Sequence, residues 1–154
     1  MTDRCICAAV ALLLPIGVAG AVEPPQLQEG LWEIHTQTIA NPGNKKDEGT
    51  HKVCRDHAYD KAADALGKNV KNGSTFSFES VGGGKYSLES RGTVSGIAIV
   101  TKGTATYQGG TSIHAEYHTT YTPAFYGETD GTMIMDQKYL GSCPAGTKPG
   151  DRIP

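Results

Sequence analysis

Two histidines and a glutamate occupy alternate positions in the stretch His114-Ala115-Glu116-Tyr117-His118. On a β-strand, the side chains of His114, Glu116 and His118 would project from one face, about 6.6 to 6.8 Å apart along the chain. Imidazole and carboxylate groups are zinc ligands, so the spacing is a weak candidate metal site, which His35 could join if its strand lay alongside. The alternative is the polar, solvent-facing side of an amphipathic strand. We favour that alternative because a zinc site needs three or four converging ligands.

Other catalytic patterns are weaker still. No G-x-S-x-G sequence marks a nucleophilic serine. The neighbouring carboxylates Asp47 and Glu48 lie in a charged stretch with nothing to raise a carboxyl pKa. The glycine run 82–84 lacks the G-x-x-x-x-G-K pattern of a phosphate-binding loop and is typical of a hairpin turn. We therefore predict no cofactor and a protein that is not an enzyme.

Aromatic side chains offer a better candidate for binding. They are concentrated in the second half of the chain, as Tyr86, Tyr107, Tyr117, Tyr121, Phe125, Tyr126 and Tyr139. On a strand, Tyr117 and Tyr121 share a face with Ile113, and in a curled sheet that face points inward. With Trp32 and Tyr86, these two tyrosines form a candidate pocket for a small apolar or aromatic ligand, oriented by their hydroxyls. The alternative is that the rings fill the interior, with Trp32 as a core anchor.

The elements that would hold these rings are strands. Apolar and polar residues alternate in windows bounded by glycines, a pattern that predicts antiparallel strands with one buried face. The predicted strands are 30–39, 50–54, one each around Phe76 and Tyr86, 97–107, 112–121 and 132–140. Residues 45–48 are expected to be a charged loop tip. Asp56 can cap one helix, from His57 to about Leu66, whose alanine-rich face would lie against the sheet, with Gly67 just beyond its end.

These elements predict a mainly β fold. We expect a curved antiparallel β-meander or a small up-and-down barrel of about seven strands with one short α-helix. One helix is too small to cover the apolar face, so the sheet is expected to curl on itself. The formal net charge of −2 gives no basic footprint for nucleic acid.

The N-terminus has the pattern of a cleaved export signal. Arg4 precedes an apolar run from Ile6 to Leu14, and Ala19-Gly20-Ala21 fits a small-x-small cleavage site. The run is too short for a comfortable membrane span, so we expect a periplasmic or secreted protein. Its single β-rich domain would cover residues 22–143, beginning with an exposed, mobile lead-in from Glu23 to Gln28, and a flexible tail would cover 144–154. Cleavage would leave Cys54 and Cys143, which predicts one disulfide bond.

Several landmarks also recur in a known family. These are Gly30-Leu31-Trp32-Glu33, Cys54-Arg55-Asp56 heading a helix, the turn Tyr107-Gln108-Gly109, and the closing Leu140-Gly141-Ser142-Cys143. In their order, the chain resembles the exported bacterial proteins of domain-of-unknown-function family 3617, over about residues 27–143. The resemblance implies a small periplasmic domain and brings no catalytic residues. Many members hold a second cysteine pair inside the domain, and that pair is absent here, because Cys5 and Cys7 lie in the predicted signal.

The function expected from these features is that of an exported, non-enzymatic binding or interaction domain. Its partner would be a small apolar or aromatic ligand or an envelope protein. The alternatives are a metal-dependent enzyme built on the His-x-Glu-x-His strand and a structural partner in an envelope complex that uses a free sheet edge.

Overall fold

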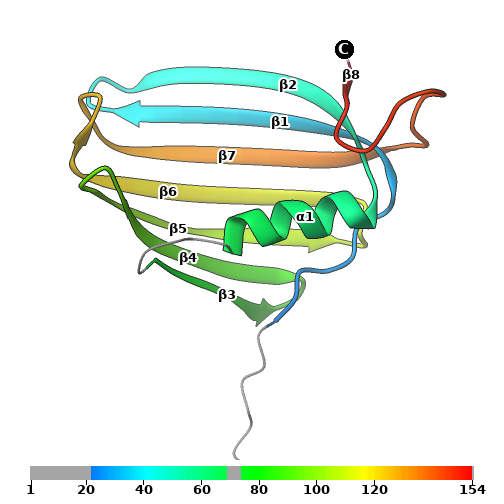
Figure 1. The fold of residues 1–154 in the computed structure, drawn as a ribbon, viewed down its shortest axis with the longest axis horizontal. Helices are drawn as coiled ribbons and strands as arrows, with labels where there is room; N and C mark the ends of the chain where they lie inside the picture. The colour runs from blue at the N-terminus through cyan, green and yellow to red at the C-terminus, as the bar shows by residue number, and fades with distance from the viewer. Residues whose placement is uncertain (1–21, 69–73, 154) are drawn as a thin grey trace, which may run out of the picture.

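The computed structural model describes residues 22–68 and 74–153, and these fold into one antiparallel sheet and one helix (Figure 1). Residues 1–21, on which the predicted export signal falls, lie outside the described residues. The elements, in chain order, are β1 (Gly30–Asn41), β2 (Lys45–Arg55), α1 (His57–Lys68), β3 (Thr75–Gly82), β4 (Lys85–Val94), β5 (Ile97–Gln108), β6 (Ser112–Phe125), β7 (Glu128–Gly141) and β8 (Arg152–Ile153). The predicted mainly β fold is confirmed.

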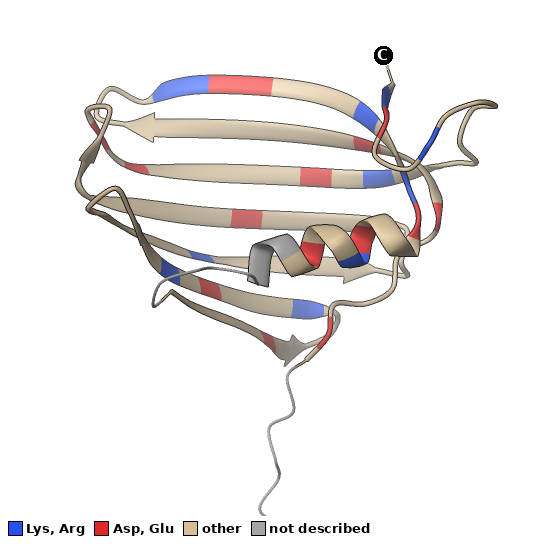
Figure 2. Cartoon of the chain, in the orientation of Figure 1, with Lys and Arg blue, Asp and Glu red and all other residues tan. Residues whose placement is uncertain are grey.

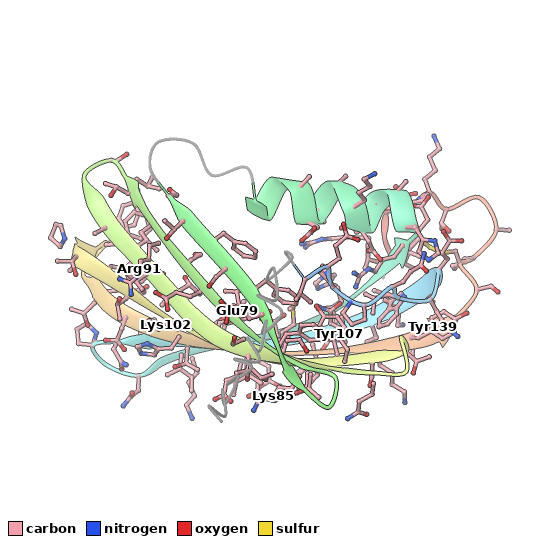
Figure 3. The ribbon with its side chains drawn as sticks, turned by 90° about the horizontal axis from the view of Figure 1, so that it is seen from below. Glu79, Lys85, Arg91, Lys102, Tyr107 and Tyr139 are labelled. Atoms are coloured by element: carbon pink, nitrogen blue, oxygen red, sulfur yellow. A yellow bond between two sulfur atoms is a disulfide. The ribbon has the colours of Figure 1, made fainter. Side chains whose placement is uncertain are left out.

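The sheet is a curved meander that does not close. Its strand order is β3-β4-β5-β6-β7-β1-β2-β8, with β3 and β8 at the two edges. The expected alternative of a barrel is therefore wrong. The sheet bends into a trough, and α1 lies on its concave side (Figure 3). Long-range pairing of β1 with β7 joins the N-terminal hairpin to the meander, with Leu31 opposite Gly141.

Period-two alternation decides which residues face the trough. Thr38, on the Trp32 side of β1, pairs with Met133, and Met133 pairs with Tyr117. Trp32, Tyr117 and Tyr121 therefore share the concave face, as the sequence predicted. The core on this face consists of Leu27, Trp32, Val53, Ala105, Ile113 and Ala115.

Trp32 is the centre of this core, with none of its surface exposed. Its indole N–H donates to the carbonyl of Gln28 at 2.8 Å, and its ring meets the edge of Tyr139 at 5.9 Å between centroids. A ring that is buried and whose polar atom has a partner stabilises the interior without an unpaired donor.

The concave face is covered by the helix and by the N-terminal lead-in (Glu23–Gln28), not by the sheet curling onto itself. Leu27 is buried, and the amide of Gln28 donates to the carbonyl of Gly110 at 2.9 Å. The ring of His57, at the start of α1, bonds to the Leu27 carbonyl at 3.0 Å. The lead-in, expected to be mobile, is thus part of the fold because its one large apolar side chain fills the core.

The helix begins at His57, as the sequence predicted. It is rotated about its own axis, so that a different face from the predicted one is turned toward the sheet. The Asp56 carboxylate accepts from the amide of Tyr59 at 2.7 Å, which caps the first turn. Ala58, Ala62 and Ala65 are exposed, whereas Asp60 and Asp64 are half-buried on the side toward the sheet. The predicted packing of the alanine face against the sheet is therefore wrong. Both aspartates lie one turn apart and face the same space.

The C-terminal segment and β2 depart from the predicted loops. Residues 45–48, expected to be a loop tip, form the first part of β2. A disulfide joins Cys54 to Cys143, with 5.7 Å between the Cα atoms, and confirms the predicted pairing. The segment expected to be a flexible tail returns to β2, where β8 pairs with Lys52 and Val53. No helix in residues 22–68 or 74–153 is long and apolar enough to cross a membrane.

Candidate ligand-binding site

A cavity of about 650 Å³ lies between α1 and the concave face of the sheet. Its floor comes from β5, β6 and β7, its roof from α1, and one end from the lead-in. The polar side chains that line it include those of Arg55, Asp60, Asp64, Tyr107, Tyr117 and Gln137. A volume of several hundred Å³ is in the range of small-molecule sites.

Tyr107 and Tyr117 bring two hydroxyls into this cavity. Tyr107 ends β5 and Tyr117 lies in mid-β6, and Figure 3 shows Tyr107 on the floor beneath the helix. Burial raises the pKa of Tyr107 to about 12, with the nearby Tyr117 hydroxyl as the next cause. Burial also raises the pKa of Tyr117. Both groups therefore stay protonated at neutral pH and are available as hydrogen-bond donors.

No hydrogen bond joins either hydroxyl to another described residue, and neither is a buried atom without a partner, so both are open to the solvent in the cavity. Each is partly withdrawn from water, which is the cause of the raised pKa values. A polar group that has lost part of its hydration and has no partner gains from a bound molecule that supplies one. The two hydroxyls are thus the feature of the cavity that most directly indicates a ligand.

Arg55 supplies a positive charge held in place by its neighbours, in a cavity that Lys61 also lines. Its Nε donates to a carboxylate oxygen of Asp60 at 2.7 Å, and its Nη1 donates to the amide oxygen of Gln137 at 2.5 Å. The guanidinium also lies 5.2 Å from the centre of the Trp32 ring. Two N–H donors of the guanidinium bond to oxygen acceptors on α1 and β7, and its cationic plane lies against an aromatic ring, so three contacts hold it in place.

Asp60 and Asp64, the two aspartates of α1 that face the sheet, counter the positive charge of Arg55 in the cavity. Asp60 neutralises Arg55 directly, and the two side chains are only 22% and 14% exposed. Asp64 is close enough to act on Tyr107, where its negative charge adds to the raised pKa while Arg55 opposes it. The charge of Arg55 is thus offset within the cavity, and Figure 2 shows the acidic bands along α1.

The four predicted binding residues are only partly brought together. Tyr117 lines the cavity, and Trp32 lies in the core beneath Arg55. Tyr86 stacks on Phe78 with 4.8 Å between ring centroids and meets the edge of Tyr107 at 5.3 Å, so it supports the cavity wall. Tyr121 does not line the cavity; it contacts Phe125 near the turn between β6 and β7.

Sequence reasoning missed the polar members of the site. The candidate pocket predicted from the sequence does not include Tyr107, although Tyr107 belongs to the aromatic set. It includes neither Arg55 nor Gln137. Tyr107 had a usable signal, because its position puts it on the same face as Ala105 within β5. Arg55 and Gln137 had none, since they lie 82 residues apart and meet only through the pairing of β1 with its two neighbours.

The predicted metal candidates lie on the opposite, convex face. His114 bonds to Asp136 at 2.7 Å and His118 contacts Asp130 at 3.4 Å, each across the β6–β7 pair, with both imidazoles more than half exposed. Asp130 accepts hydrogen bonds from Asn41, Thr129 and His118, which lower its pKa. Within the described ranges, no three His, Cys, Asp or Glu side chains are placed to hold a metal ion.

His35 does not join this strand, because β7 lies between β1 and β6. It contacts Glu48 at 3.3 Å and Thr50 at 2.9 Å, both on β2. The histidines of the convex face are therefore each engaged by a neighbouring strand, in the manner of polar cross-strand pairs.

Comparison of the chain with protein-family models, curated proteins and solved structures finds no match. The chemistry of the cavity is therefore the guide to function.

Proposed function

We propose that this protein is an exported, non-enzymatic binding domain that holds a small apolar or aromatic ligand in the cavity beneath α1. The observation that carries the proposal is that two half-buried tyrosines, Tyr107 and Tyr117, line one cavity. Leu27, Ile113 and Met135 add apolar surface to the same wall, and a mixture of apolar surface and oriented polar groups is typical of ligand sites. The disulfide and the resemblance to family 3617 support an oxidising compartment.

The two alternative functions have less support. A metal-dependent enzyme would need His114, Glu116 and His118 to converge, and they stand side by side on an exposed strand. A purely structural partner would use the outer edge of β3, which is open. An open edge permits strand addition but does not account for the cavity or its hydroxyls.

The cavity can be tested with N-phenyl-1-naphthylamine, an uncharged dye whose fluorescence rises in apolar surroundings. We expect the wild-type protein to bind it at one site. Ala63→Trp should weaken binding by about tenfold or more, because Ala63 lines the cavity and a large ring there would occupy it. Ala62→Trp is the matched control, since Ala62 is exposed like its neighbour Ala63 but does not line the cavity.

Two outcomes would contradict the proposal. One is that the wild-type protein produces no saturable rise in fluorescence. The other is that Ala63→Trp and Ala62→Trp bind the dye equally well. Export is tested separately by the intact mass of protein secreted from its cell, which should begin at Val22.

A further inference from the structure

We infer that the cavity selects an uncharged molecule that presents a hydrogen-bond-accepting oxygen, such as an ester or ketone carbonyl, next to an apolar body. This inference rests on the proposed function and names the class of its ligand. It follows from which donors the cavity leaves open and from how its charges are arranged.

Arg55, Tyr107 and Tyr117 present hydrogen-bond donors to the cavity. Arg55 has five N–H groups, of which one meets Asp60 and one meets Gln137. The remaining N–H groups of Arg55 have no partner among the described residues, and the side chain lines the cavity. The hydroxyls of Tyr107 and Tyr117 add two further donors. An oxygen acceptor on the ligand would satisfy donors that the protein itself leaves unpaired.

The donors also lie close enough to act together. Tyr107, Tyr117 and Arg55 line the same cavity, from β5, β6 and the end of β2. A ligand oxygen there can accept from a tyrosine hydroxyl and from the guanidinium. Sites built to hydrogen-bond a polar group discriminate strongly against analogues that lack it, because their own polar groups are then left unpaired.

The charges disfavour an anionic ligand. Asp60 offsets the positive charge of Arg55 at 2.7 Å, and Asp64 faces the same space one turn along α1. Glu23 and Lys61 also line the cavity, so three carboxylates face two cationic side chains there. A carboxylate entering the cavity would lose hydration and meet this excess of negative charge. An uncharged carbonyl loses less hydration and keeps the same acceptor oxygen.

A matched series of naphthalenes separates these effects. The probes are naphthalene, methyl 2-naphthoate and 2-naphthoate, each measured by displacement of N-phenyl-1-naphthylamine at pH 7. The three share one ring system and differ in the acceptor oxygen and in charge. We expect the ester to bind about tenfold more tightly than naphthalene, as one or two net hydrogen bonds would give. The carboxylate should bind more weakly than the ester.

Three phenylalanine substitutions identify the donors. Tyr107→Phe and Tyr117→Phe keep the rings and should each weaken binding of the ester severalfold, while naphthalene binding stays unchanged. Tyr139→Phe is the control, because Tyr139 packs against Trp32 and does not line the cavity. Each variant is expected to stay folded, since only a hydroxyl is removed.

The outcomes distinguish this inference from the proposed function. If the dye and all three naphthalenes fail to bind, the proposed function is wrong. If naphthalene binds as tightly as the ester, the binding function stands and the inference is wrong. Tightest binding of 2-naphthoate, or of the cation 2-naphthyltrimethylammonium added as a fourth probe, would also overturn the inference.

Discussion

Gly103 explains how a ring as large as Tyr117 fits on the floor of the cavity. It lies opposite Tyr117 in the β5–β6 pair. A methyl group on Gly103 would stand 2.6 Å from Cδ1 of the Tyr117 ring and would also collide with the carbonyl oxygen of Glu116. The missing side chain therefore provides the space over which the tyrosine lies.

We expect Gly103→Ala to lower the free energy of unfolding by about 1–3 kcal/mol, as overpacking does. Gly49→Ala is the matched control. Gly49 is also within a strand, and no atom lies within 4 Å of the position that a methyl group would take. That change should leave stability unchanged or raise it by up to about 1 kcal/mol. Urea denaturation of both variants checks the difference, and equal midpoints would contradict it.

The Tyr107 hydroxyl should lose its proton at a higher pH than an ordinary tyrosine does. Its pKa is about 12 in the folded protein, against 10.0 for an ordinary tyrosine. Between these pH values the folded chain holds the Tyr107 proton more tightly than the unfolded chain does. The contribution of this proton to the free energy of unfolding is therefore fully present below pH 10 and is lost as the pH rises through about 12. Tyr107→Phe should therefore lose less stability than wild type over that range. Absorbance at 295 nm should show one fewer late-titrating tyrosine in the variant, and a difference spectrum centred at pH 10 would refute the assignment.

At the scale of elements, α1 presents the clearest departure from a simple amphipathic helix. Ala58, Ala62 and Ala65 are exposed, whereas Asp60 and Asp64 face the sheet. A helix selected for packing alone would be rotated the other way. The ion pair between Asp60 and Arg55 holds the observed rotation, which is why an alanine stripe misled the sequence prediction. Local rules fail most often where a functional group must be positioned.

The disulfide joins the end of β2 to the chain that leaves β7. We expect the double variant Cys54→Ala with Cys143→Ala to lose on the order of 4 kcal/mol of stability, because the bond closes a long loop in the unfolded chain. The amide of Gly150, which donates to the Cys54 carbonyl at 2.8 Å, should exchange faster in the variant.

A reductant provides the control for this change. It should destabilise the wild-type protein by a similar amount and leave the double variant unaffected. Equal stability of oxidised and reduced wild-type protein would show that the bond does not contribute.

The polar face of β6 should tolerate substitution. We expect His114→Ala with His118→Ala to change the free energy of unfolding by less than about 0.5 kcal/mol for each site at pH 7, because exposed ion pairs contribute little. Dye binding in the cavity should be unchanged, since both side chains are on the other side of the sheet. Stoichiometric zinc in the wild-type protein that disappears in the variant would revive the metal-dependent alternative.

At the scale of the whole molecule, the sequence was a good guide to strands and a poor guide to closure. Alternation along β6 predicted which face Tyr117 and Tyr121 occupy, because a strand's period of two is a local property. Whether the sheet closes depends on the pairing of its edges, and no local pattern reports on that pairing. The sequence also failed to show that Leu27 would fill the core and make a barrel unnecessary.

The same limit applies to the cavity. Tyr117 could be selected because alternation along β6 puts it on the same face as Ile113. The position of Arg55 beside Gln137 depends on the order of β2, β1 and β7 in the sheet, which brings distant segments together. The charge of the cavity could not be predicted before the rotation of α1 was known.

The pairing of β1 with β7 also determines the order in which parts of the sheet can form during synthesis. During synthesis, the β1–β2 hairpin and the β3–β6 meander can each form from neighbouring residues as soon as they emerge. The seam between them must wait for β7, because Leu31 has no partner on that side until Gly141 arrives. Until then Trp32 lacks the Tyr139 ring that packs against it, and the apolar floor stays open to water. The period before β7 docks is therefore the time when the chain is most exposed to chaperones, to proteases and to other unfinished copies of itself.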